Sequence, residues 1–169
     1  MVQVRIASIA IDPSTGQPVI ILQPLGEPED NRLLPIWIGH PEAAAILLAV
    51  QGVSTPRPMT HDLLMSALES VGFAAEQVEI TRVDDGTFFS NVLLRDQKTD
   101  EVRLVDSRPS DAIAIAVRAC APIFVARSVL EEAAIPGGSV SIGVNVDDDA
   151  AIEEFRAFLE RVDPADFQG

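Results

Sequence analysis

The chain has 169 residues, of which 47% are hydrophobic and 22% are charged, and its formal net charge is −14. This length and apolar content predict one globular domain with its own core and exclude a disordered chain. One cysteine, Cys120, excludes an intramolecular disulfide and indicates a reducing compartment. No apolar stretch is long enough for a bilayer, and the first residues lack a signal-peptide pattern. We therefore expect a cytoplasmic protein without a membrane partner.

The negative charge is spread unevenly along the chain. Residues 1–127 carry 16 acidic and 10 basic side chains, whereas residues 128–169 carry 10 acidic and 2 basic ones. Binding of nucleic acid through overall charge alone is excluded by this balance. A local basic patch on the first part of the chain remains compatible with it.

In the first half of the chain, the spacing of apolar residues changes once, from the alternation of strands to the spacing of helices. Alternating apolar and polar residues predict strands at 2–10, 17–24 and 33–39. Helical spacing and terminal signals then predict helices at 40–52 and 60–71. Pro56 and Pro58 separate these two helices, because neither fits a regular helix interior.

The second half returns to strands. We predict strands at 77–83, 87–95, 101–105 and 122–126, with helices at 109–119 and 128–135. An Asp85-Gly86 pair between the first two of these strands indicates a hairpin. Beyond a PGGS boundary at 136–139 we predict a strand at 140–146 and an amphipathic helix at 148–162.

This order of elements lacks strict alternation of strands and helices. It predicts an α+β fold, with a mixed, mostly antiparallel sheet and helices packed on it. We expect a single compact core at 1–135 and a C-terminal appendage of one strand and one acidic helix at 136–169.

Two proline-containing segments carry the candidate functional residues. They are PRPMTHD at 56–62 and DSRPSD at 106–111, and each places an Arg before a Pro at the start of a helix. Free N–H groups at a helix N-terminus favour an anion, and the guanidinium groups of Arg57 and Arg108 suit a phosphate. His61 has the chemistry of a general base, and nearby carboxylates have the chemistry of divalent-metal ligands.

The same residues have structural explanations. Thr60 and Ser107 are common helix caps, with Thr60 expected at the N-cap of the second helix and Ser107 at that of the third. Arg57 and Arg108 could pair with the neighbouring aspartates in a structural network rather than bind a ligand. The residues alone leave both explanations open.

Four strings resemble the bifunctional nuclease domain family. They are LPIWIGHPEAAAI at 34–46, STPRPMTHDLL at 54–64, GTFFSNVLL at 86–94 and DSRPSDAIAIAVR at 106–118. The resemblance covers residues 1–135 and implies hydrolysis of DNA and RNA with little sequence preference. It also implies an intracellular homo-oligomer, for which we expect a dimer. It assigns no catalytic residue.

From the matching motif positions we predict the site. The predicted catalytic residues are His61, Asp62, Arg108 and Asp111. The predicted substrate contacts are Arg57, Arg108, Thr60 and Ser110. A Mg²⁺ or Mn²⁺ ion would be held by Asp62, Asp106 and Asp111.

The competing hypothesis is a non-catalytic, oligomeric module that regulates a partner or binds a small anionic ligand. In that case the Arg/Asp/His cluster is structural. Buried and fully paired arginines favour this second hypothesis, whereas an open site with unpaired arginines favours phosphate chemistry. If the two segments lie far apart in the fold, one shared site is excluded.

Overall fold

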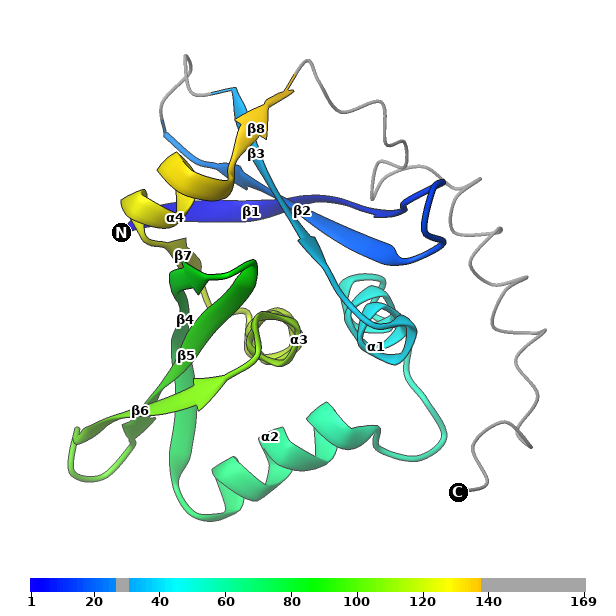
Figure 1. The fold of residues 1–169 in the computed structure, drawn as a ribbon. Coiled ribbons are helices and arrows are strands. Elements are labelled where there is room, and N and C mark those ends of the chain that lie inside the picture. The colour runs from blue at the N-terminus through cyan, green and yellow to red at the C-terminus, as the bar shows by residue number, and fades with distance from the viewer. Residues whose placement is uncertain (27–30, 138–169) are drawn as a thin grey trace.

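The computed structural model describes residues 1–26 and 31–137, and these form one eight-stranded sheet with helices packed on it (Figure 1). The α+β architecture predicted from the sequence is therefore confirmed. The strand and helix predicted within 140–162 lie outside the described residues. No helix in the described ranges has both the length and the apolar character needed to cross a bilayer.

The strands lie in the order β6-β5-β4-β7-β1-β2-β3-β8. Their bounds are Val2–Ile11 (β1), Pro18–Pro24 (β2), Arg32–Trp37 (β3), Phe73–Asp84 (β4), Thr87–Asp96 (β5), Val102–Ser107 (β6), Ile123–Val125 (β7) and Ile135–Pro136 (β8). Neighbouring strands run antiparallel except for β4 and β7, which pair in parallel. The sheet is thus mixed and mostly antiparallel, as predicted.

The β4–β5 hairpin turns at the predicted Asp-Gly pair. Asp85 has φ of 48° and Gly86 has φ of 74°, and Asp84 lies opposite Thr87. Two consecutive left-handed residues match the twist of the flanking strands, and glycine adopts this conformation without strain. Strand β4 begins at Phe73 rather than 77, because a bulge between Ala75 and Gln77 interrupts the alternation on which the sequence prediction rested.

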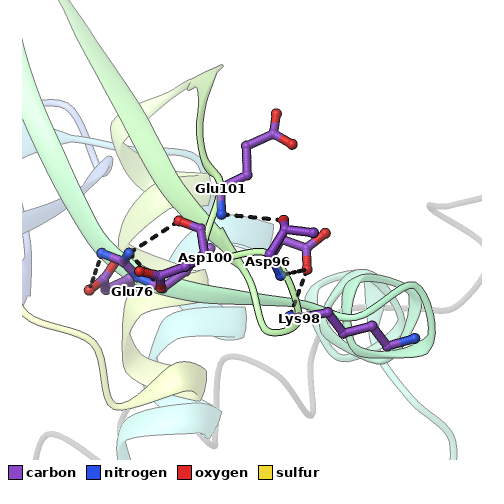
Figure 2. A network of polar contacts seen from close by, with 7 residues as sticks. Glu76, Asp96, Lys98, Asp100 and Glu101 are labelled. Carbon is purple, nitrogen blue, oxygen red and sulfur yellow. Dashed lines mark hydrogen bonds and ion pairs between the residues drawn. The ribbon is translucent and has the colours of Figure 1, made fainter.

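The β5–β6 hairpin is fixed by a polar turn, which Figure 2 shows. The Asp96 carboxylate accepts the backbone N–H groups of Lys98 at 2.7 Å and Thr99 at 3.0 Å. The Arg95 guanidinium donates to Glu76 on β4 and to Asp100 in the turn, both at 2.9 Å. The turn therefore holds β6 in one register on β5.

Helix α3 (Pro109–Ala119) lies at the centre of the helical layer, between the β4–β5 pair and α1 (Figure 1). It buries every residue from Ala112 to Ala116. The other helices are α1 (His40–Val50), α2 (Thr60–Ser70) and α4 (Arg127–Ala133). In contrast to α3, α2 has no buried residue. Its position therefore depends on partly buried contacts and on polar contacts at its N-terminus.

Candidate functional site

The two proline-containing segments meet in the fold. The first leads into α2, and the second joins the end of β6 to the start of α3. His61 Nε2 lies 3.1 Å from Asp111 Oδ1. Asp62 Oδ1 accepts a hydrogen bond of 2.6 Å from Nε of Arg118, further along α3. Two consecutive residues of α2 thus contact two residues of α3, and a single shared site is geometrically possible.

Asp111 organises one half of this cluster. Arg108 donates from Nε to Asp111 Oδ2 at 2.7 Å and from Nη2 to Oδ1 at 3.1 Å. The third guanidinium nitrogen, Nη1, lies 2.9 Å from Oε1 of Glu42 in the first turn of α1. Arg108 therefore joins α3 to α1, yet its side chain remains 65% exposed. A large ligand can still reach it.

Asp62 organises the other half and stabilises the start of α2. Its Oδ2 accepts the backbone N–H of Met59 at 2.8 Å, while Oδ1 is held by Arg118. Met59 is the N-cap and Thr60 the first helical residue, so the prediction that Thr60 caps α2 is wrong. Likewise Arg108, not Ser107, is the N-cap of α3, because Ser107 ends β6 and shares hydrogen bonds with Ser90.

Both aspartates are held in their charged form. The hydrogen bond from Arg118 lowers the pKa of Asp62, and the backbone N–H of Met59 lowers it further. Burial raises the pKa of Asp111, but the hydrogen bonds from Arg108 and His61 outweigh it, so the net shift is downward. The same bond to Asp111 raises the pKa of Arg108. The His61 side chain is only 12% exposed, and its Nε2 is hydrogen-bonded to Asp111.

The remaining predicted residues lie in different environments. Arg57 is exposed, and its guanidinium has no hydrogen bond or ion pair to another residue in the described ranges. Thr60, three residues further along, is also exposed. Ser110 is buried, which does not favour direct contact with a large substrate. Asp106 is exposed on β6, opposite Asn91.

Asp106 points away from the cluster. Successive residues of a strand face opposite sides of a sheet. Ser107 faces the helix-covered side, because its hydroxyl contacts the fully buried Ser90. Asp106 therefore faces the other side of the sheet and does not converge with Asp62 and Asp111.

The described side chains do not form the metal site predicted at Asp62, Asp106 and Asp111. Within residues 1–26 and 31–137 there is no group of three or more His, Cys, Asp or Glu side chains placed to hold a metal ion. The carboxylate oxygens of Asp62 and Asp111 are already hydrogen-bonded to arginines and to the backbone. Use of Mg²⁺ or Mn²⁺ stays a prediction, and we derive no step through a metal.

The site predicted from the sequence left out two residues of the cluster, Arg118 and Glu42. Arg118 follows Asp111 by seven residues, and this spacing puts both on one face of a helix two turns apart. That spacing was a usable signal. Glu42 comes from α1, and only the tertiary fold brings it to Arg108. Gly39 leaves room for it, because a Cβ at that position would overlap the Glu42 carboxylate.

Arg118 is expected to carry a large share of the attachment of α2 to α3. Its side chain is 10% exposed and also donates to the carbonyl of Ala114 at 3.0 Å. Arg118→Ala should lower the free energy of unfolding by about 2 kcal/mol, because it removes charged hydrogen bonds in a largely buried place. Asp84→Asn, which removes an exposed ion pair with Arg82, should change it by less than about 0.5 kcal/mol. Equal effects in urea unfolding would contradict the role of Arg118.

The lowered pKa of Asp62 predicts a pH dependence. A carboxyl group whose folded pKa lies below its ordinary value of 3.8 stabilises the fold above that value. The stabilisation is lost as the pH falls through the folded pKa. The stability difference between the natural chain and Asp62→Asn, measured by urea unfolding, should therefore be full at neutral pH and shrink below pH 3.8. A difference that is constant with pH would show that the ionised Asp62 is not involved.

Comparison with known proteins places this chain in a family. The bifunctional nuclease domain family matches residues 23–137. An uncharacterized protein of Mycobacterium tuberculosis is 38% identical over 170 residues, covering 99% of both chains. Bifunctional nuclease 1 of Oryza sativa subsp. indica is 31% identical over 104 residues, 61% of this chain and 31% of the plant protein. Bifunctional nuclease 1 of Arabidopsis thaliana is 31% identical over 109 residues, 64% of this chain and 33% of its own length. On the family match over most of its length, the chain belongs to the bifunctional nuclease domain family.

Proposed function

We propose that the chain is a nuclease that hydrolyses phosphodiester bonds of DNA and RNA with little sequence preference. The observation that carries the proposal is the partly buried His61–Asp111 pair beside the exposed Arg108, with the exposed Arg57 four residues before His61 in the sequence. The family and the plant relatives named as bifunctional nucleases support the same chemistry. We place the activity in the cytoplasm and expect a homodimer.

The proposed roles follow from the geometry. An ionised Asp111 only accepts hydrogen bonds, so it holds a proton on Nε2 of a neutral His61. The other ring nitrogen, Nδ1, then carries the lone pair and can take a proton from an attacking water. Arg57 and the exposed part of Arg108 contact the phosphate and stabilise the negative charge that develops on it. Contacts to phosphate rather than to bases explain little sequence preference.

One observation favours the second candidate, a non-catalytic module that binds a small anion or regulates a partner. All three guanidinium nitrogens of Arg108 already face carboxylates, and Arg118 is almost buried. The three carboxylates of Glu42, Asp62 and Asp111 also outnumber these two arginines. A nucleic acid must compete with Glu42 and Asp111 for Arg108. Arg57 has no such competitor in the described ranges, and it decides between the candidates.

The test is hydrolysis of single-stranded and double-stranded DNA and RNA by highly purified protein. His61→Ala should lower the rate by at least about 10²-fold, because general acid–base catalysis contributes that much. Arg57→Ala should weaken nucleic-acid binding and lower by about 1 the slope of its logarithmic dependence on salt concentration. Arg82→Ala, on the exposed part of β4, is the matched control and should leave both quantities unchanged.

Two outcomes would overturn the nuclease proposal. Activity that persists in the folded His61 and Arg57 variants would place the chemistry elsewhere or in a contaminant. Absence of activity in all conditions, with nucleic acid or with a small anion bound at Arg57, would favour the non-catalytic module. Running each reaction with Mg²⁺, with Mn²⁺ and with a chelator tests the expected metal dependence at the same time.

A further inference from the structure

Among the described residues, strand β6 is an unprotected edge of the sheet. It pairs with β5 on one side and with no other described strand on the other. All its residues from Val102 to Asp106 are exposed, including Val102 (44%), Leu104 (60%) and Val105 (45%). The opposite edge, β8, is only two residues long and contains Pro136. Short edges and prolines prevent strand addition, and β6 has neither protection.

The direction of the free backbone groups of β6 can be derived. The carbonyl of Glu101 accepts the N–H of Asp96 on β5 at 2.8 Å, so the backbone groups of Glu101 point toward β5. Hydrogen-bonding direction alternates along a strand, and the β5–β6 register runs from Val102 to Ser107 without a bulge. The N–H and C=O groups of Val102, Leu104 and Asp106 therefore point outward.

We propose that β6 pairs antiparallel with β6 of a second copy of this chain, with Leu104 opposite the partner's Leu104. Residues directly opposite each other in an antiparallel pair have their side chains on the same face of the sheet. A two-fold axis perpendicular to the sheet therefore passes at one residue of β6, which lies opposite its own copy. When the axis passes at Leu104, the outward N–H and C=O groups of Val102, Leu104 and Asp106 all find partners, in about six hydrogen bonds. An axis at Val105 would leave the outward backbone groups of Val102 without a partner in β6. An axis at Arg103 would place two arginines opposite each other.

Charge also favours a second copy in this register. Residues 101–107 contribute only −1 of the net charge of −14, from Glu101, Arg103 and Asp106. Repulsion between two copies is therefore small along this edge. Arg103 lies opposite the partner's Val105, and Asp106 opposite the partner's Val102, so no like charges face each other. The polar turn after β5 (Figure 2) presents the strand in a fixed register.

The pairing has a consequence for the Arg108 cluster. The perpendicular two-fold axis keeps the helices of both copies on one face of a continuous sheet. Arg108 lies four residues beyond Leu104, so the two clusters would lie about 27 Å apart along the strand direction. This interface is independent of the proposed activity, since it would form whether or not the clusters cut nucleic acid.

Disulfide trapping tests the register. In a Cys120→Ser background, Leu104→Cys places the two introduced thiols opposite each other, with Cα atoms about 5.5 Å apart, within the range of a disulfide. Val102→Cys is the matched control on the same face of the same strand, where the two thiols lie at least about 13 Å apart. Under mild oxidation we expect more than about 80% of Leu104→Cys and less than about 10% of Val102→Cys to run as a disulfide-linked dimer on a non-reducing gel, on which these fractions can be measured to about 10%.

Light scattering of the full chain tests the dimer itself. The chain mass is 18.1 kDa, and we expect twice this mass for the natural protein. Leu104→Asp should give a monomer with an unchanged circular dichroism spectrum, because it sets two carboxylates opposite each other. Leu63→Asp, at the equally exposed Leu63 of α2, should remain dimeric. A monomeric natural chain, or a dimer that persists in Leu104→Asp with equal trapping of both cysteine variants, would overturn the proposal.

Discussion

The attachment of α2 to α3 by the His61–Asp111 hydrogen bond and the Asp62–Arg118 ion pair is the constraint on which the candidate site depends. His61 and Asp62 are adjacent on α2, and they contact Asp111 and Arg118, two turns apart on α3. Because α2 buries no residue, these polar contacts fix its N-terminus where hydrophobic packing does not. Charged pairs orient helices specifically, and they stabilise only when both partners are present. The site and the local fold thus share the same residues.

Because the same residues form the site and hold the local fold, the cluster has both a structural and a chemical explanation. Arg118 and Asp62 form the structural side, where Arg118 is almost buried and both carboxylate oxygens of Asp62 accept hydrogen bonds. Arg108 and Arg57 face solvent, and only the first of them is already paired. A phosphate on this open side would find Arg108 beside the adjoining N-termini of α2 and α3, and Arg57 precedes α2 by three residues. The structural and the chemical roles therefore belong to different halves of one cluster, and they do not exclude each other.

The sequence predicted the fold class, the helices at the two segments and the Asp-Gly hairpin, because these depend on local period and turn chemistry. It grouped Asp62, His61, Arg108 and Asp111 in one site because both segments place an Arg before a Pro at the start of a helix, with an Asp nearby. It misplaced the caps, because Met59 and Arg108 cap without the usual side chains. The predicted site left out Glu42 and included Asp106, because the partner of Glu42 and the sheet face of Asp106 are set by tertiary structure.

The proposed nuclease must bind nucleic acid on the open side of this cluster. The most direct measurement follows the side-chain Nε–Hε NMR signals of the arginines during titration with a hydrolysis-resistant phosphorothioate oligonucleotide. We expect the signals of Arg57 and Arg108 to shift together and saturably, while those of Arg82 and Arg95 stay in place. Shifts confined to arginines outside the cluster, or none at saturating oligonucleotide, would contradict it.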